Sequence, residues 1–199
     1  MKAYLKTVQN IVGPNGLKSV LNYAHLEKYV DNFPPDNEEL EIPLEDLQGL
    51  YHSLIELFGS KGARSLQLRV GRGNVQRGFE RRPKTMKAIQ LAARVVPEIR
   101  KIRLVLEKLI EYDKKFYTHS GQNLIELREE EDCFLIVHGD RFESEGITSQ
   151  TPVCGDFVGT IDALTEWITG HPHRVEEIEC RAMGHLADVF RVSKAEIEH

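Results

Sequence analysis

The sequence predicts an α+β fold, in which a helical N-terminal half packs with a small antiparallel β-sheet that carries one inserted helix. Two observations lead to this prediction. Apolar residues recur at helical spacing through most of residues 1–118, whereas residues 119–199 contain short apolar runs bounded by turn residues. Helices therefore come first and strands follow, an order that is typical of an α+β domain rather than of a parallel βαβ fold. We expect a single domain over residues 1–199.

The first helices are separated by glycine and proline residues. Residues 3–12 have the pattern of a short helix, which GPNG at 13–16 is expected to break. Apolar residues then recur at helical spacing from Leu17 to Val30, and the loop NFPPDNEE follows at 32–39. The start of the chain is therefore expected to form two short helices.

A second helical region begins near Pro43, which suits the first turn of a helix. Its first helix is expected to end at GSKG, residues 59–62. Residues 62–80 are ambiguous, because their glycines fit a helix interior poorly although their apolar residues suggest a partly buried helix. From Lys84 the pattern is strongly helical, with an interruption at Pro97. The broad apolar face after this proline is either core or a dimer or signal-relay surface.

The second half alternates strands with one helix. Residues 123–129 and 132–139 have the composition of two strands around an acidic turn. Residues 155–169 have an apolar helical face, and the sequence GHPH that follows is a stop signal. Residues 174–181 and 188–193 are expected to form a closing hairpin. The result is a small antiparallel sheet with one helix inserted between its strands.

Composition and charge indicate a cytoplasmic protein that does not depend on nucleic acid. The formal net charge of −5 argues against nucleic acid as the main partner. No apolar run approaches the roughly 18 residues of a membrane span, and the N-terminus is too polar for a secretory signal. In the cytoplasm the three cysteines stay reduced, so metal ligation or burial of a thiol is a better interpretation than a disulfide.

Two of these cysteines flank one helix–turn–strand unit. Cys154 precedes the predicted helix, Cys180 ends the strand after it, and Glu177 lies three residues before Cys180. A hairpin can bring Asp188 beside Cys180, and packing of the helix on the sheet can bring Cys154 to both. Thiolate and carboxylate ligands of this kind suit zinc. The alternative is a pair of buried cysteines with two surface carboxylates.

Two features oppose a metal site of this composition. Glu177 and Cys180 point to opposite faces of a regular strand, so a bulge or a bend is needed for both to reach one ion. Two thiolates and two carboxylates also overcompensate the charge of a divalent ion. The nearby basic residues that can offset this charge are His171, His173, Arg174, Arg181 and His185.

The stretch PVCGDFVGTIDALTEWITGHPHRVEEIECRAMGHLADVFRV resembles the C-terminal half of the 4-vinyl-reductase-like domain, also called the hydrocarbon-binding domain. The residues that carry this resemblance match without a gap: Pro152-Val153-Cys154, Gly170, Glu177-Ile178-Glu179-Cys180 and Gly184. The N-terminal half resembles the family more loosely, in residues 10–21 and 54–72. The resemblance implies a fold shared with subunits of the TRAPP vesicle-tethering complex and related to haem nitric-oxide-binding domains.

The resemblance also implies a structural zinc site at Cys154, Glu177, Cys180 and Asp188. Its role would be structural because every candidate ligand is a protein group, whereas a catalytic zinc keeps an open position. The family usually has a cysteine where this chain has Asp188. Aspartate can ligate zinc, and His185 is the alternative ligand at this end of the site.

In function, the resemblance implies a binding module. We expect a stand-alone sensor or carrier that holds a small hydrophobic ligand, a hydrocarbon or a tetrapyrrole-like molecule, between its helices and its sheet. A homodimer through the helices before residue 118 and a protein partner for signalling are further expectations. The alternatives are an accessory protein or reductase of tetrapyrrole metabolism and a TRAPP-like scaffold subunit.

Two observations restrict these expectations. The helix after Cys154 begins GDFVGTID and lacks the aromatic and tyrosine residues of phenol-type sensors, so phenol recognition is not transferred to this chain. The sequence also contains no Ser-His-Asp order, phosphate-binding loop, dinucleotide fingerprint or catalytic pair of carboxylates. No catalytic residue is therefore predicted.

Overall fold

The computed structural model describes residues 2–35, 42–116 and 124–197, and its elements follow the predicted order. The first part contains helices: α1 (Lys2–Tyr23), the 3-10 helix η1 (Glu27–Tyr29), α2 (Leu44–Arg81), α3 (Pro83–Ala93) and α4 (Glu98–Phe116). The second part contains β1 (Ile125–Glu129), β2 (Cys133–His138), α5 (Gly155–Thr169), β3 (His173–Glu179), the 3-10 helix η2 (Arg181–Met183) and β4 (Asp188–Glu196). The predicted α+β class is confirmed.

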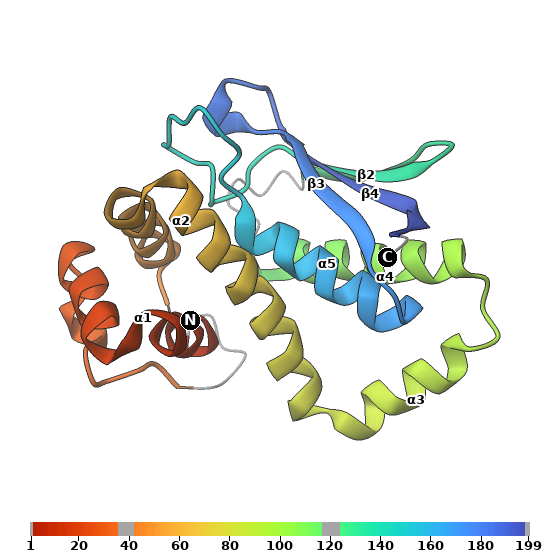
Figure 1. Ribbon diagram of the computed structural model, residues 1–199, viewed down its shortest axis with the longest axis horizontal. Helices are drawn as coiled ribbons and strands as arrows, with labels where there is room; N and C mark the ends of the chain where they lie inside the picture. Colours follow the sequence, from red (N-terminus) through yellow and green to blue (C-terminus); the bar gives the residue numbers. More distant parts are fainter. Residues whose placement is uncertain (1, 36–41, 117–123, 198–199) are drawn as a thin grey trace.

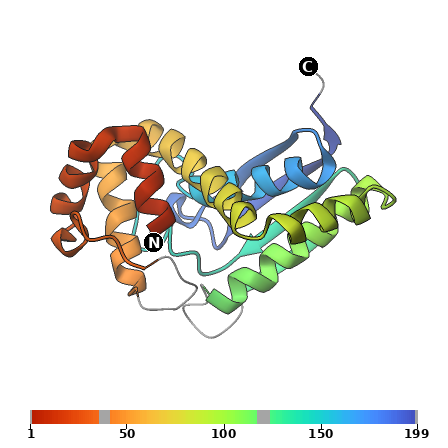
Figure 2. The same cartoon turned by 90° about the horizontal axis from the view of Figure 1, so that it is seen from below.

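The strands form one antiparallel sheet in the order β1-β2-β4-β3. Helices α4 and α5 lie side by side on one face of this sheet (Figures 1 and 2). In sequence, α5 lies between β2 and β3. The segment before α5 and the end of β3 meet at one corner of the sheet. This corner carries the candidate site.

The apolar core has two parts. One part lies between the sheet, α4 and α5, and includes Ile102, Phe134, Ile161 and Phe190. The other lies among α1, η1 and α2, where it extends from Leu50 to Val70 (Figure 2). Ile55 of α2 packs against both parts, so α2 connects the helical lobe to the sheet lobe.

The ambiguous residues 62–80 form the second half of α2, and their glycines have a packing role. A Cβ atom on Gly71 would collide with the backbone of Asp156 in α5, and one on Gly159 would collide with the backbone of Leu68 in α2. The two helices therefore cross so closely that each needs a glycine at the contact. This close crossing accounts for glycines that intrinsic helix propensity disfavours.

The two expected helix breaks are confirmed as sharp bends. Gly13 has non-helical backbone angles (φ 79°, ψ 168°), so α1 consists of two helices that meet at GPNG. Gly59 is also non-helical (φ 68°, ψ 165°), so α2 consists of two helices that meet at GSKG, and the second continues to Arg81. A glycine at positive φ redirects a helix without a connecting loop. The helical pattern expected to reach Val30 ends at Tyr23, and only η1 follows.

The predicted elements of the second half are confirmed within one or two residues at most boundaries. Helix α5 has the predicted bounds, and Gly170 at φ 97° closes it in the left-handed conformation. Cys133 is buried on β2 as a free thiol. Among the described residues, no helix is both long and apolar enough to cross a bilayer.

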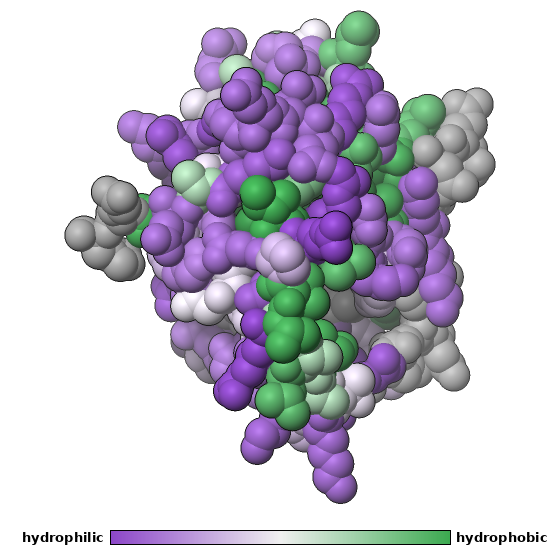
Figure 3. All heavy atoms as spheres, turned by 90° about the vertical axis from the view of Figure 1, so that its right-hand side faces the viewer, coloured by the Kyte–Doolittle hydropathy of each residue, from purple (hydrophilic) through white to green (hydrophobic). Residues whose placement is uncertain are grey.

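Helix α3 lies at the edge of the molecule and is almost wholly exposed (Figure 1). Figure 3 shows a strip of apolar side chains over α3 and the start of α4. The exposed large apolar residues of this region are Ile89, Leu91, Val95 and Ile99. An apolar strip of this kind on one edge is typical of a surface that contacts another molecule.

Candidate metal centre

The four side chains of the predicted metal site lie together. Cys154 directly precedes α5, Glu177 lies on β3, Cys180 directly follows β3, and Asp188 begins β4. One ligand atom from each lies within 4.8 Å of every other, and all four residues are buried. Around a tetrahedral zinc ion such atoms are about 3.3–3.8 Å apart, so a small inward movement would complete the coordination.

A bulge in β3 resolves the geometric difficulty that the sequence raised. Glu177 pairs with Phe190 of β4, but Glu179 pairs with Val189, so the register shifts between these positions. The strand then ends, and Cys180 lies at the start of the η2 turn. Glu177 and Cys180 can therefore face the same point, as a regular strand would not allow.

Arg64 of α2 offsets part of the negative charge of this cluster. Its Nη1 donates to Oε2 of Glu177 and to the carbonyl of Pro152, both at 3.0 Å. The N–H of Cys154 donates to the same Oε2, also at 3.0 Å. The other oxygen, Oε1, is buried without a hydrogen-bond partner. A cation in the cluster would satisfy this orphaned oxygen.

Outer hydrogen bonds orient Asp188. Ser144 Oγ donates to Oδ2 at 2.7 Å, and the backbone N–H of Arg181 donates to Oδ1 at 2.8 Å. In metal sites, hydrogen-bond donors of this kind fix the orientation of the carboxylates that ligate the ion. Burial and the adjacent Cys180 raise the pKa of the Cys154 thiol well above its ordinary value, with Glu143, Glu177 and Asp188 adding to the effect. A buried thiol in this setting needs a nearby cation to ionise.

The basic residues suggested by the sequence do not surround the cluster. His185 is exposed, and its Nδ1 contacts the backbone of Cys180 rather than the other ligands. Arg174 pairs with Glu176, and the Arg181 side chain pairs with Glu145 at 2.6 Å. His171 precedes β3 and His173 begins it, and both belong to a different group, with Glu98. The offsetting charge comes from Arg64, 113 residues from Glu177 in sequence.

A buried polar network ties α2 to the segment that carries Cys154. The Tyr51 hydroxyl lies 3.2 Å from Glu143 Oε1 and 3.4 Å from the carbonyl of Val153, and it accepts from the N–H of Asp156 at 3.1 Å. Burial raises the pKa of Glu143 to about 8, although Arg141 beside it acts in the opposite direction. The start of α5 is thus held from the helical lobe through Tyr51 and Arg64.

The same network continues to α4. Arg141 pairs with Glu143 and, at 3.2 Å, with Asp113. Asp113 also contacts His138 Nε2 at 2.7 Å. All four side chains are buried, so each charge depends on its partner.

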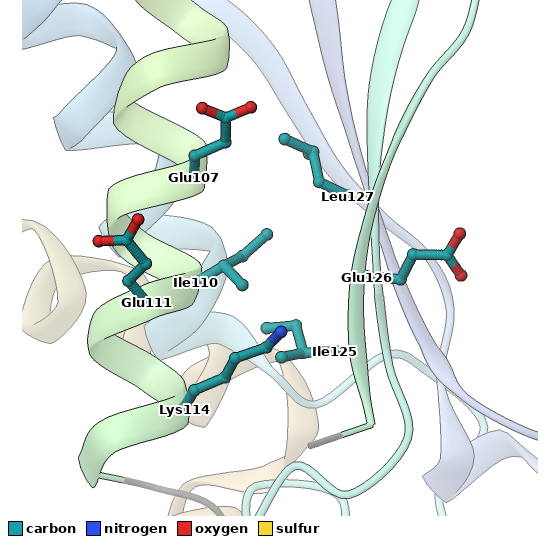
Figure 4. A pocket seen from close by; sticks show the side chains of 7 residues that line it. All are labelled: Glu107, Ile110, Glu111, Lys114, Ile125, Glu126 and Leu127. Carbon is teal, nitrogen blue, oxygen red and sulfur yellow. The ribbon is translucent and has the colours of Figure 1, made fainter.

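A groove of about 400 Å³ lies between α4 and β1 (Figure 4). The side chains of Ile110, Ile125 and Leu127 face one another across it, and Glu126 points away from the helix. The other residues that line it are Glu107, Glu111 and Lys114. The volume is in the range of sites for small molecules, but the groove is open to solvent, and four of the seven residues that line it are charged.

H-NOX domains are among the solved structures with this fold. A structure from a study of haem distortion in the H-NOX family matches with a TM-score of 0.59 at 15% identity, over 99% of this chain and 94% of that one. A mutant of T. tengcongensis H-NOX matches with a TM-score of 0.58 at 15% identity, over 98% and 96%. Identity at this level shows a shared fold alone. No protein-family model matches the chain, and no curated protein matches it in sequence.

The residues of the groove do not fit an axially ligated haem. Haem iron in proteins is held by histidine, cysteine, methionine or tyrosine side chains. None of the seven residues that line the groove is of these types. This chain therefore shares its fold with H-NOX domains, but its groove offers no side chain that could ligate haem iron.

Proposed function

We propose that this chain is a cytoplasmic small-molecule-binding domain of the 4-vinyl-reductase-like (hydrocarbon-binding) type, with a structural zinc ion. The observation that carries the proposal is the convergence of Cys154, Glu177, Cys180 and Asp188 at one buried point. These are the residues that the sequence resemblance assigns to zinc. The three cysteines are free thiols, which suits a reducing compartment.

The proposed zinc ion would act as a fixed link between segments. Four protein groups would complete a tetrahedral site, so no position remains for a substrate. The ion would hold the start of α5 against β3 and β4. Arg64 would offset one of the two excess negative charges that remain after zinc binds, and would fix the orientation of Glu177.

The groove between α4 and β1 is the proposed site for the small molecule. Its floor consists of Ile110, Ile125 and Leu127, which also belong to or pack against the sheet-side core. The carboxylates of Glu107 and Glu111 at its edge favour a neutral or cationic end group over an anion. A ligand here would contact a helix and a strand at once, as expected for a domain that reports occupancy by a change in helix position.

Binding of the neutral apolar dye N-phenyl-1-naphthylamine tests this site. The wild-type chain should bind the dye with increased fluorescence. Leu127→Lys should weaken binding at least about tenfold, since it places a charge on the apolar floor. The control is Leu104→Lys, which changes an exposed leucine of α4 outside the groove. Equal binding by both variants, or no binding by the wild type, would exclude the groove.

We also propose that the protein forms a homodimer through α3 and the start of α4. The support is the apolar strip formed by Ile89, Leu91, Val95 and Ile99, which no other part of the described chain covers. The same strip favours a TRAPP-like scaffold subunit as the second candidate function. A scaffold would form a stable hetero-oligomer and would not bind the dye.

A further inference from the structure

We propose that Glu98, His171 and His173 form a second metal site, which binds a divalent transition-metal ion. Glu98 is the first residue of α4, and the two histidines flank Pro172 where α5 turns into β3. One ligand atom from each residue lies within 4.8 Å of the others. No residue is shared with the thiolate cluster, so the two sites are separate.

The orphaned ring nitrogen of His173 is the main support. The His173 side chain is 0% exposed, and its Nε2 has no hydrogen-bond partner. Its Nδ1 lies 3.1 Å from the carbonyl of Ser193 and 3.2 Å from that of Ala195, so Nδ1–H donates to the backbone. In the neutral ring, Nε2 is then an acceptor. It faces Glu98 Oε1, also an acceptor, at 3.8 Å. Two acceptors aimed at one another call for a cation between them.

His171 differs from His173 in its hydrogen bonds. Its Nε2 lies 2.9 Å from Glu98 Oε2, whereas its Nδ1 is buried without a hydrogen-bond partner and lies 3.4 Å from Glu196 Oε2. Metal-ligating histidines commonly donate the other ring N–H to a carboxylate or a backbone carbonyl. The β4 carbonyls of Ser193 and Ala195 supply such outer partners for His173, and Glu196 is the nearest carboxylate to Nδ1 of His171. Both rings are therefore oriented with Nε2 toward Glu98.

Two imidazoles and one carboxylate suit zinc, copper, nickel or iron rather than calcium or magnesium. Glu98 is 39% exposed and His171 28% exposed, so water would fill the remaining coordination positions. The ion would join the start of α4 to the α5–β3 turn. These are the two helices that cover the sheet (Figure 1), so occupancy would restrain their relative position.

Cobalt(II) titration tests the second site. The chain as purified is treated briefly with a chelator to remove exchangeable metal, and Co²⁺ is then added during calorimetry and absorption measurements. The proposal predicts that each chain binds one equivalent of Co²⁺ in addition to any metal that resists the chelator. This Co²⁺ should show weak d–d bands and no sulfur-to-metal charge transfer, because its ligands are nitrogen and oxygen. His171→Ala and Glu98→Gln should each weaken this equivalent at least about tenfold.

The matched control is His52→Ala, which removes a part-exposed histidine of α2 and should leave the additional equivalent unchanged. The variants at Glu98 and His171 are chosen because both residues are partly exposed, so that folding is retained. If the wild type takes up no additional Co²⁺, only a proton links the three residues and the proposal is wrong. Uptake that persists in both variants, or that shows a sulfur band, would also overturn it.

Discussion

Asp188 lies where the resembling family usually has cysteine, and both of its oxygens accept hydrogen bonds from neighbouring groups. We predict that Asp188→Asn lowers zinc affinity at least about tenfold, because the ligand charge is lost while the shape is kept. Asp188→Cys should raise affinity, since thiolate is a softer ligand for zinc. Competition with a chromophoric chelator measures both effects. The control His185→Ala should bind as the wild type does, and loss of zinc there would assign the ligand to His185 instead.

Asp113 is a buried residue whose charge is required by its neighbours. Burial raises the pKa of Asp113. Arg141 and His138 together lower it by more than burial raises it, so the pKa is below its ordinary value of 3.8. The ionised carboxylate therefore stabilises the fold above pH 3.8, and this contribution is lost as the pH falls through the lowered folded-state pKa. Asp113→Asn should reduce the free energy of unfolding at neutral pH by about 3 kcal/mol.

Urea denaturation at several pH values measures this effect. The difference between the wild type and Asp113→Asn should shrink as the pH falls below 3.8, where the unfolded carboxylate becomes protonated, and should vanish below the lowered pKa of the native carboxylate. Glu111→Gln on the same helix is the control, because its exposed pairing with Lys108 contributes little. A pH-independent difference would show that the charge of Asp113 is not the cause.

At the scale of elements, the α2–α5 crossing depends on glycine. Gly159→Ala should lower the free energy of unfolding by about 1–3 kcal/mol, because the new methyl group meets the backbone of α2. Gly78→Ala, later in α2, has open space around its Cβ position and should raise stability by up to about 1 kcal/mol. Thermal denaturation of both variants gives the comparison. If both substitutions had the same sign, close packing of α2 and α5 would not be the reason for these glycines.

The elements show what could be predicted from the sequence. The strands and α5 have short periodic patterns with clear turn residues, and their order gave the fold class. The helix breaks at Gly13 and Gly59 were predicted from their glycines, but their form as sharp bends was not, because a glycine signal does not distinguish a bend between two helices from a loop. The ligand set near β3 was predicted from a motif. Arg64 and Glu98 were not, because only the folded chain brings them to Glu177 and to the His171–His173 pair.

At the scale of the whole molecule, the exposed α3 edge is the proposed contact between subunits. Val95 is 90% exposed at this edge, so Val95→Asp should leave the fold intact and shift a dimer to monomer. Light scattering during size-exclusion chromatography measures the mass. Leu186→Asp is the control, because Leu186 is also almost fully exposed but lies in the turn before β4, away from α3. A wild-type monomer, or a dimer that both variants retain, would contradict the proposed interface.

The central claim is that the cluster of Cys154, Glu177, Cys180 and Asp188 holds zinc. Native mass spectrometry of the purified chain after brief chelation, with spectra before and after denaturation, tests it most directly. We predict one retained zinc ion per chain, lost on denaturation and absent from Cys180→Ala and Asp188→Asn, but present in Cys133→Ala, whose thiol is buried outside the cluster. A metal-free wild-type chain, or zinc that persists in Cys180→Ala, would contradict the claim.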